Sequence, residues 1–298
     1  MRYRITVACL LVTLAVSLQS IFTRPPDTNA HQNTSLDKTI DVGGYNLYIS
    51  CSGKSVNHSP TVIMEAGLNS SSETWSNIQP EIAKFTRVCT YDRAGMGKSD
   101  PPPQQPRTSS QIARDLHTLL TKTRIAGPIV LVGHSFGGIN VRMYASLYPK
   151  NVVGMILVDS SHEEDTARWL AIIPPEIRRE MENAGGRRLL GSEGIDLQES
   201  QRQMKAANWH TDMPLIVLSR GRSSYNPDDY PPQLRSFAPK GEELRIKLQE
   251  DLASRSSRSK HSFAERSGHM IHRDQPELVI DAIRQVVEAT RLKDRKNF

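Results

Sequence analysis

A serine between two glycines is the first pattern in this sequence that could support a chemical reaction. In the segment IVLVGHSFGG, Gly133, Ser135 and Gly137 form a Gly-x-Ser-x-Gly pattern directly after an apolar stretch and directly before a helical pattern. A serine on a sharp strand-to-helix turn needs glycines two positions away, because the backbone there is strained and crowded. The pattern therefore predicts that Ser135 is a nucleophile. The alternative is a glycine-rich turn with an idle serine.

A serine hydroxyl is a weak nucleophile at neutral pH, so it needs a base that takes its proton. Far downstream, the segment RSGHMIHRDQP contains two histidines in a loop between a strand pattern and a helix that begins at Pro276. We expect His269, which follows a glycine, to be this base, with His272 as the competitor. Both could instead form an H-x-x-H metal pair, but no third ligand at a suitable spacing accompanies them, so no metal site is predicted.

Acyl-transfer chemistry also needs backbone N–H groups that stabilise the developing oxyanion. Phe136, directly after the proposed nucleophile, supplies one such group. The second is expected from the loop after an earlier strand, in TVIMEAGLNSSSETW, where Gly67 allows a turn and leaves the Leu68 amide free. The alternative for Gly67 is an ordinary turn at the end of a strand.

The elements that must position these residues alternate between short apolar stretches and longer helical patterns. The apolar stretches are TVIMEAG, RVCTYD, IVLVGHS, VGMILVDS and PLIVLSRG, and continuous hydrophobicity of this kind is typical of parallel strands buried on both faces. Thr108 and Gln111 form a capping-box pattern ahead of one helix, and Pro276 begins the last one. The alternation predicts an α/β fold with crossover helices.

Length and composition exclude several classes of protein. The chain has 298 residues, 37% of them hydrophobic, which is enough for one large domain or at most two. These fractions are not those of a disordered chain, a collagen, a coiled coil or a multi-span membrane protein. The net charge of +6 is scattered, and no long basic run is interleaved with aromatic residues, so a nucleic-acid partner is not expected.

The N-terminus differs in kind from the rest. Arg2 and Arg4 precede an uncharged, mostly apolar stretch, so residues 1–22 are predicted to be a signal peptide. The alternative is an uncleaved anchor that tethers the protein to a membrane. Residues 23–38 form a polar linker in either case. The exported protein would be secreted or held in the cell envelope, where Cys51 and Cys89 could pair or remain two buried free thiols.

Taken in order, these motifs resemble the α/β-hydrolase fold family, from about Thr39 to Thr290. The matching segments are EAGLNSSSETW, YDRAGMGKSD, GHSFGG, MILVDSSH, PLIVLSRG and SGHMIHRDQPELV. The resemblance implies a mostly parallel eight-stranded sheet with helices on both faces, a nucleophile–acid–histidine triad and no cofactor. It also implies a core of residues 39–160 and 210–298, with a helical cap over residues 161–209.

The family usually places its acid shortly after the strand PLIVLSRG, where this sequence has Arg222, Ser223 and Ser224, with Asp228 and Asp229 arriving late. The other location that the family uses is the end of the preceding strand, where Asp159 stands. The resemblance therefore implies Asp159 as the acid, with Asp228 or Asp229 as the alternatives. A residue at this strand end could also serve only as a cap.

Two further features of the resemblance concern the loops beside the site. Relatives often have His-Gly where this chain has Glu65-Ala66, which weakens a closer subfamily assignment. Asp92 and Arg93, in YDRAGMGKSD, are expected to be structural and to tie a loop beside the site by a charge-assisted hydrogen bond.

A serine at the elbow of this fold indicates a serine esterase-like enzyme that cleaves carboxylic esters or related acyl compounds through an acyl-enzyme. Its expected partner is a small ester-like substrate, and its oligomeric state stays open. One alternative is a hydrolase-like protein that binds a small molecule without turnover. The other is carbon–carbon bond hydrolysis or perhydrolysis on the same triad.

Overall fold

The computed structural model describes residues 35–54, 59–125, 127–179, 193–221 and 232–295. The predicted signal peptide or anchor, residues 1–22, and the predicted linker up to residue 34 lie outside these ranges. The last residues of that linker are part of the sheet, because the first strand begins at Leu36. No helix in the described ranges is long and apolar enough to cross a membrane.

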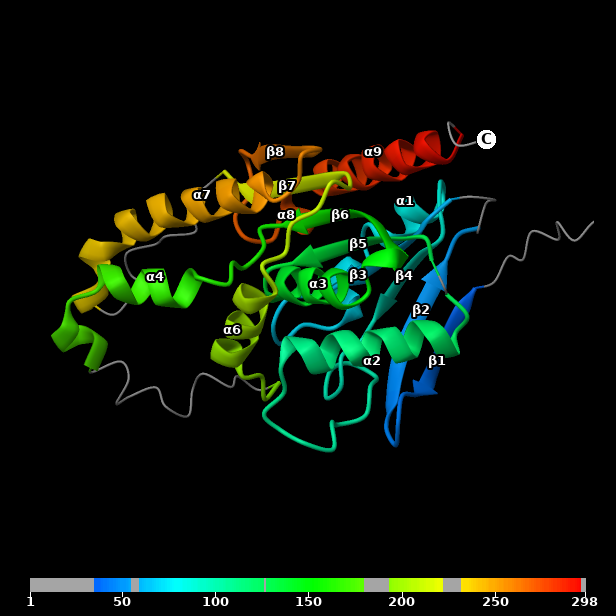
Figure 1. Cartoon of the computed structure of the whole chain (residues 1–298), viewed down its shortest axis with the longest axis horizontal. Helices are drawn as coiled ribbons and strands as arrows, with labels where there is room; N and C mark the ends of the chain where they lie inside the picture. The colour runs from blue at the N-terminus through cyan, green and yellow to red at the C-terminus, as the bar shows by residue number, and fades with distance from the viewer. Residues whose placement is uncertain (1–34, 55–58, 126, 180–192, 222–231, 296–298) are drawn as a thin grey trace, which may run out of the picture. The chain divides into compact units, whose positions relative to one another are not determined.

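The described core is built on one eight-stranded sheet (Figure 1). Its strands are β1 (Leu36–Asp41), β2 (Asn46–Ser52), β3 (Thr61–Glu65), β4 (Val88–Tyr91), β5 (Ile129–His134), β6 (Val152–Val158), β7 (Leu215–Arg220) and β8 (Ser259–Ala264). They lie in the order β1-β2-β4-β3-β5-β6-β7-β8. The pairs β1–β2 and β2–β4 are antiparallel and the other pairs are parallel, which confirms the predicted fold class.

Helices cover both faces of this sheet (Figure 1). They are α1 (Gln79–Ala83), α2 (Ser109–Lys122), α3 (Phe136–Leu147), α4 (Asp165–Ile172), α6 (Leu197–Ala207), α7 (Ala238–Ser254), α8 (Ile271–Asp274) and α9 (Pro276–Arg295). Short 3-10 turns cover Ser72–Trp75, Pro149–Asn151 and Pro232–Phe237. One buried apolar cluster lies between the sheet and helices α2, α3 and α7, and a second lies under α1 and α9. Two apolar layers therefore hold the sheet on its two faces.

Two helices begin where the sequence predicts. Helix α2 starts after Thr108, whose backbone N–H donates to Oε1 of Gln111 at 2.8 Å, and this is one half of a capping box. Helix α9 starts at Pro276, and its apolar stripe is buried: Val279, Ile283, Val286 and Val287. Both predicted helix starts are confirmed.

The parallel strands all deliver their carboxyl ends to one edge of the sheet. Strand β3 ends at Glu65, β5 at His134 and β6 at Val158, directly before or close to the residues with predicted chemistry. In open α/β sheets, ligands bind outside this edge. The fold therefore brings together the segments that contain Leu68, Ser135 and Asp159.

The predicted cap, residues 161–209, contains helices α4 and α6, with residues 180–192 outside the described ranges. Helix α4 packs against α7, whereas α6 packs on α2 and α3. Met204 of α6 is fully buried in the apolar cluster above the sheet. Part of this segment is therefore firmly attached to the core.

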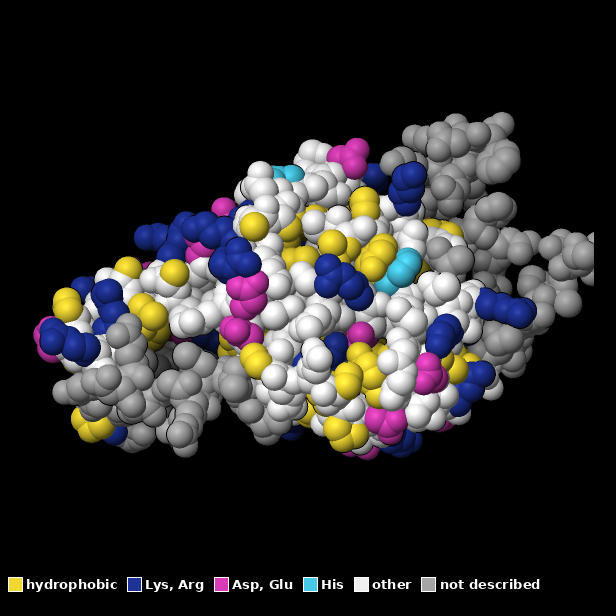
Figure 2. Space-filling view, turned by 60° about the horizontal axis from the view of Figure 1, so that its bottom comes forward, with side chains coloured by type: hydrophobic (Ala, Val, Ile, Leu, Met, Phe, Trp, Pro, Cys, Tyr) yellow, Lys and Arg dark blue, Asp and Glu magenta, His cyan; other side chains and the backbone are white. Residues whose placement is uncertain are grey.

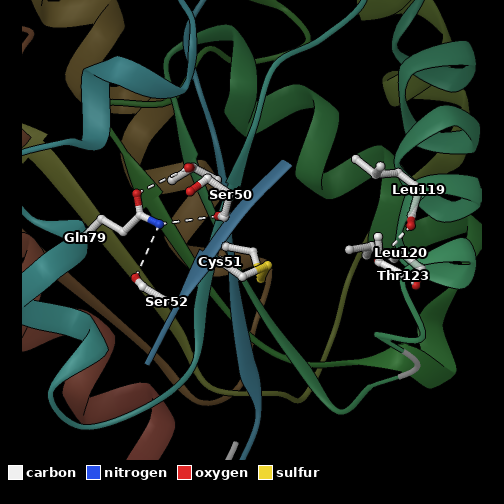
Figure 3. Close-up of a disulfide and its surroundings, with 9 residues drawn as sticks. Ser50, Cys51, Ser52, Gln79, Leu119, Leu120 and Thr123 are labelled. Atoms are coloured by element: carbon white, nitrogen blue, oxygen red, sulfur yellow. Dashed lines mark hydrogen bonds between the residues drawn. A yellow bond between two sulfur atoms is a disulfide. The ribbon is translucent and has the colours of Figure 1, made fainter. Parts of the chain in front are cut away.

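Cys51 and Cys89 form a disulfide between strands β2 and β4 (Figure 3). The two residues lie directly opposite each other in the antiparallel pair, with 4.0 Å between their Cα atoms. Both are buried among apolar neighbours. Beside them, Nε2 of Gln79 donates to the carbonyl oxygen of Ser50 at 3.4 Å. The structure thus has the pair rather than two free thiols.

Reducing this disulfide is expected to lower the free energy of unfolding by about 3–4 kcal/mol, because the bond restricts an unfolded-chain loop of 38 residues. Urea unfolding with and without dithiothreitol measures this difference. A Cys51→Val/Cys89→Val double variant is the control, and dithiothreitol should leave its midpoint unchanged. Equal midpoints for the wild type with and without the reductant would contradict the prediction.

Charged side chains are scattered over the face shown in Figure 2. Lys and Arg side chains lie there in separate groups, with Asp and Glu between them. Over the described part of this face they form no continuous basic surface. The prediction that nucleic acid is not a partner stays a prediction, and this face gives no reason to change it.

Candidate active site

Ser135 lies on a sharp turn between strand β5 and helix α3. Its backbone has φ 53° and ψ −125°, a region that residues other than glycine rarely adopt. The neighbouring backbone holds this turn, because the N–H of Ser135 donates to the carbonyl of Val158 at 3.1 Å and its own carbonyl accepts from Ser161 at 2.9 Å. The predicted strand-turn-helix context of this serine is therefore present.

The two glycines beside Ser135 are needed for close packing. A Cβ atom on Gly133 would lie 2.7 Å from the carbonyl oxygen of Gly137. A Cβ atom on Gly137 would lie 2.6 Å from the carbonyl oxygens of Glu65 and Ala66. Real Cβ atoms do not approach backbone so closely, so each glycine is required where it stands.

The structure brings together Asp159 and His269, which are 110 residues apart. Nδ1 of His269 lies 2.6 Å from Oδ2 of Asp159. A carboxylate only accepts hydrogen bonds, so the ring donates from Nδ1 and its Nε2 remains free to accept a proton. His269 keeps 38% of its side chain exposed, whereas Asp159 is almost fully buried. This is the geometry of a base oriented by an acid.

Sequence reasoning did not identify the group that accompanies Asp159. The backbone N–H of Arg220, at the end of β7, lies 3.2 Å from Oδ1 of Asp159, and its Nη1 lies 3.3 Å from Oδ2. Nη1 of Arg245 lies 3.6 Å from Oδ1. Burial by itself would raise the pKa of Asp159, but the hydrogen bond from His269 and the charge of Arg220 lower it below its ordinary value. The carboxylate therefore stays ionised.

His272, the competing base, lies elsewhere. Its ring is fully buried, with Nε2 3.0 Å from Oγ1 of Thr74, and it packs against Trp75 at 4.7 Å between ring centroids. The loop with His269 is fixed separately, because Oδ2 of Asp274 accepts from the N–H of Gly268 at 3.1 Å. Of the two histidines, the structure pairs only His269 with Asp159.

A second buried histidine lies directly behind the site. Nε2 of His134 donates to the carbonyl oxygen of His269 at 3.0 Å, and its ring lies 4.6 Å from the rings of both His269 and His272. Burial lowers the pKa of His134 to about 3 and the pKa of His272 to about 4, with further lowering from the neighbouring His269. Both rings are therefore neutral at physiological pH.

Acidification is expected to destabilise the fold through these two rings. Below the ordinary histidine pKa of 6.5, these two side chains are protonated in the unfolded chain but stay neutral in the folded protein. The free energy of unfolding therefore falls as the pH drops towards 4. Each ring should account for about 2 kcal/mol at pH 5. Urea unfolding at pH 7.5 and pH 5 of the wild type, His272→Asn and the exposed control His210→Asn measures this. Between the two pH values, the free energy of unfolding of His272→Asn should fall by about 2 kcal/mol less than that of the wild type. A fall equal to that of the wild type contradicts the assignment.

The two predicted oxyanion donors lie on either side of Ser135. Phe136 is the first residue of α3, directly after the serine. A Cβ atom on Gly67 would lie 3.3 Å from Cβ of Ser135, so the loop before Leu68 is in contact with the nucleophile. Within the described residues, neither the Leu68 nor the Phe136 N–H has a hydrogen-bond acceptor. Both groups are therefore available to a ligand.

Arg93 holds the oxyanion loop from behind. Its Nη1 donates to Glu65 and to the carbonyl of Ala66, each at 2.7 Å, and its Nη2 donates to the carbonyl of Gly67 at 2.7 Å. It also pairs with the buried Glu193. The expected loop-tying role of Arg93 is thus present, but the pairing with Glu193 has no signal in the sequence, because the two residues are 100 positions apart.

Asp92 is also expected to tie a loop beside the site, and its carboxylate accepts hydrogen bonds from two backbone N–H groups. Its Oδ1 accepts from Ser72 at 2.6 Å and its Oδ2 accepts from Lys98 at 2.8 Å.

The alternative acids Asp228 and Asp229 lie outside the described residues. Among the residues that the structure does describe, no group of three or more His, Cys, Asp and Glu side chains could hold a metal ion.

Comparison with known proteins gives matches over most of the chain. A family model described as the alpha/beta hydrolase fold matches residues 60–246. The Bacillus subtilis protein named Uncharacterized protein YqjL is 30% identical over 227 residues, which is 76% of this chain and 83% of that protein. An AB hydrolase superfamily protein from Gibberella zeae is 32% identical over 123 residues, which is 40% of this chain but only 38% of that longer protein.

Solved structures show the same likeness in three dimensions. A thermophilic esterase from Thermogutta terrifontis has a TM-score of 0.60 to this chain at 21% sequence identity, covering 87% of this chain and 99% of the esterase. At this level of identity the likeness concerns the fold.

Proposed function

Because this chain belongs to the alpha/beta hydrolase fold family, we propose that it is a serine hydrolase that cleaves carboxylic esters or related acyl compounds through an acyl-enzyme. The observation that carries this proposal is the 2.6 Å contact between His269 and Asp159, at the sheet edge where Ser135 stands on a strained turn. An idle glycine-rich turn has no need of an oriented base beside it. The family resemblance inferred from the motifs is confirmed; the ester substrate is our proposal.

In the proposed mechanism, Ser135 attacks the carbonyl carbon of the substrate while Nε2 of His269 takes the hydroxyl proton. Asp159 accepts the Nδ1–H of the ring, which fixes the tautomer and stabilises the imidazolium that forms. The N–H groups of Leu68 and Phe136 receive the negative charge that develops on the carbonyl oxygen. His269 then protonates the leaving group and activates the water that hydrolyses the acyl-enzyme.

Steady-state hydrolysis of short-chain p-nitrophenyl esters tests this function. We expect saturable turnover with an initial burst of p-nitrophenol when deacylation is slower than acylation. A folded protein that shows no ester turnover, but binds a small acyl compound in a thermal-shift assay, would replace the proposal with the binding-protein alternative. Two further substrates test the other reactions on the same triad. If esters are not hydrolysed, turnover of a vinylogous 1,5-diketone would favour carbon–carbon bond hydrolysis, and turnover of peroxide with a carboxylic acid would favour perhydrolysis.

We also propose that the protein is exported. The Cys51–Cys89 disulfide supports this, because disulfides persist mainly in oxidising compartments. Secretion after cleavage and a membrane tether through residues 1–22 are distinguished by the mass of the native N-terminus. Cytosolic protein with its N-terminal Met in place would contradict export.

A further inference from the structure

We propose that Glu193 is a positioning residue for the oxyanion hole, which acts through Arg93 and Asn69 to keep the Leu68 N–H directed at Ser135. This inference rests on the proposed function. Glu193 lies in the segment between β6 and β7. Apart from Asp159 at its start, this segment contains no residue of the predicted triad.

The argument begins with the side chain of Arg93, which is 3% exposed. A guanidinium group has five N–H donors, and all five have acceptors here. Nε bonds Oε1 of Glu193 at 2.5 Å and Nη2 bonds Oε2 of Glu193 at 2.8 Å, in a two-pronged pair. The other three donors bond Glu65 and the carbonyls of Ala66 and Gly67. Any other conformation of the Arg93 side chain would break several of these hydrogen bonds.

Two hydrogen bonds to the Gly67 carbonyl, from Arg93 and from the backbone N–H of Ser70 at 3.2 Å, fix the direction of the Leu68 amide. The C=O of Gly67 and the N–H of Leu68 belong to the same planar trans peptide, so they point in opposite directions. Nη2 of Arg93 holds that carbonyl at 2.7 Å on the side away from solvent. The Leu68 N–H is therefore turned away from Arg93. A Cβ atom on Gly67 would lie 3.3 Å from Cβ of Ser135, so this peptide is next to the nucleophile.

Glu193 is attached to the same loop by two further bonds. Its backbone N–H donates to Oδ1 of Asn69 at 3.0 Å, and its Oε2 accepts from the backbone N–H of Asn69 at 3.0 Å. The residues after it are held by Arg107, whose N–H donates to the carbonyl of Gly194 at 2.9 Å and whose carbonyl accepts from Asp196 at 2.8 Å. Glu193 thus connects a fixed segment to the residues on both sides of Leu68. It bonds Asn69 directly and Gly67 through Arg93.

The charge of Glu193 is also needed. Arg93 is buried, and burying its positive charge without a counter-charge would strongly destabilise the fold. Glu193 contacts the guanidinium through both of its carboxylate oxygens, whereas Glu65 contacts it through one. The guanidinium of Arg93 further lies 5.9 Å from the ring centroid of Phe136, the residue of the second oxyanion donor. Arg93 therefore lies close to the residues of both proposed donors.

The test compares Glu193→Gln with the matched control Glu164→Gln. Glu164 lies in the same inserted segment and pairs with Arg168 and Lys205 at 2.5 and 2.8 Å, away from the oxyanion loop. Rates of p-nitrophenyl ester hydrolysis are expressed per active site, titrated with a fluorophosphonate. The affinity for a trifluoromethyl ketone, which forms a tetrahedral adduct that needs the oxyanion hole, is measured beside them.

For Glu193→Gln we expect kcat per titrated site to fall about 10- to 100-fold with KM changed less than about 3-fold, because the Leu68 donor acts mainly in the transition state. The affinity for the trifluoromethyl ketone should fall in parallel. Glu164→Gln should match the wild type in both. A merely structural role would reduce the number of titrated sites and leave kcat per site unchanged, and that result overturns the proposal.

Asn69→Gly keeps the test decisive if Glu193→Gln does not fold. Asn69 has φ 55°, which glycine adopts without strain, so this change removes the side-chain acceptor of Glu193 and leaves the Arg93 pair in place. We expect kcat per site to fall about 3- to 10-fold. Values for Asn69→Gly equal to those of the wild type overturn this proposal alone. A folded wild type with neither turnover nor labelling overturns the proposed function, and this proposal with it.

Discussion

Replacing Ser135 with alanine is expected to lower kcat for ester hydrolysis by about 10⁴-fold or more, because no other group can form the acyl-enzyme. The free energy of unfolding should change little. Alanine and serine are both L-residues with a Cβ atom, so the strained backbone at φ 53° is the same in both. Steady-state kinetics and urea unfolding of the two proteins measure the two effects.

Ser161→Ala is the matched control for this variant. The backbone N–H of Ser161 donates to the carbonyl of Ser135 at 2.9 Å, so its backbone is next to the nucleophile, but the bond does not involve the side chain. We expect this variant to keep turnover within about 3-fold of the wild type. Hydrolysis by Ser135→Ala at the wild-type rate would show that the elbow serine is not the nucleophile.

Replacing Asp159 with asparagine is expected to lower kcat by about 10⁴-fold, the second large effect. The amide offers an NH2 group or a carbonyl in place of the carboxylate, so it no longer stabilises the imidazolium and it favours the wrong tautomer of His269. Arg220 keeps a partner in the variant, because its Nη2 also bonds Glu242 at 2.7 Å. The fold should therefore tolerate the change.

Asp228→Asn and Asp229→Asn test the competing assignment of the acid. If Asp159 orients His269, as the 2.6 Å contact indicates, both of these variants should keep kcat within about 3-fold of the wild type. Near-normal turnover by Asp159→Asn, together with a large loss in Asp228→Asn or Asp229→Asn, would transfer the role to the later aspartates.

Much of the fold can be predicted from local sequence patterns. Continuous apolar stretches predict the parallel strands, and the glycine spacing around Ser135 predicts the turn on which it stands. These signals are local because burial on both faces of the sheet, and the lack of room for a Cβ atom beside Ser135, each restrict the residue types at one position. The 2.6 Å contact between Asp159 and His269 also agrees with the position of the acid that the family resemblance implies, at the end of the strand before PLIVLSRG.

The groups that support these residues could not be predicted in the same way. Arg220 is the last residue of β7, the strand after which relatives of this fold often have their acid. Its contact with Asp159 depends on the register of β6 and β7. The Arg93–Glu193 pair joins residues 100 positions apart, and no spacing rule connects them. The same holds for Cys51 and Cys89, which pair because β2 and β4 are neighbours in the sheet. Tertiary register, rather than residue type, determines each of these contacts.

Intact-mass analysis after treatment with a fluorophosphonate tests the central claim most directly. The reagent forms a stable adduct only with a serine that a base activates and an oxyanion hole assists. We predict one adduct per molecule of wild type, none on Ser135→Ala and a much slower reaction with Asp159→Asn. An adduct that persists on Ser135→Ala, or a folded wild type that forms none, would contradict the assignment of Ser135, His269 and Asp159 as an assembled triad.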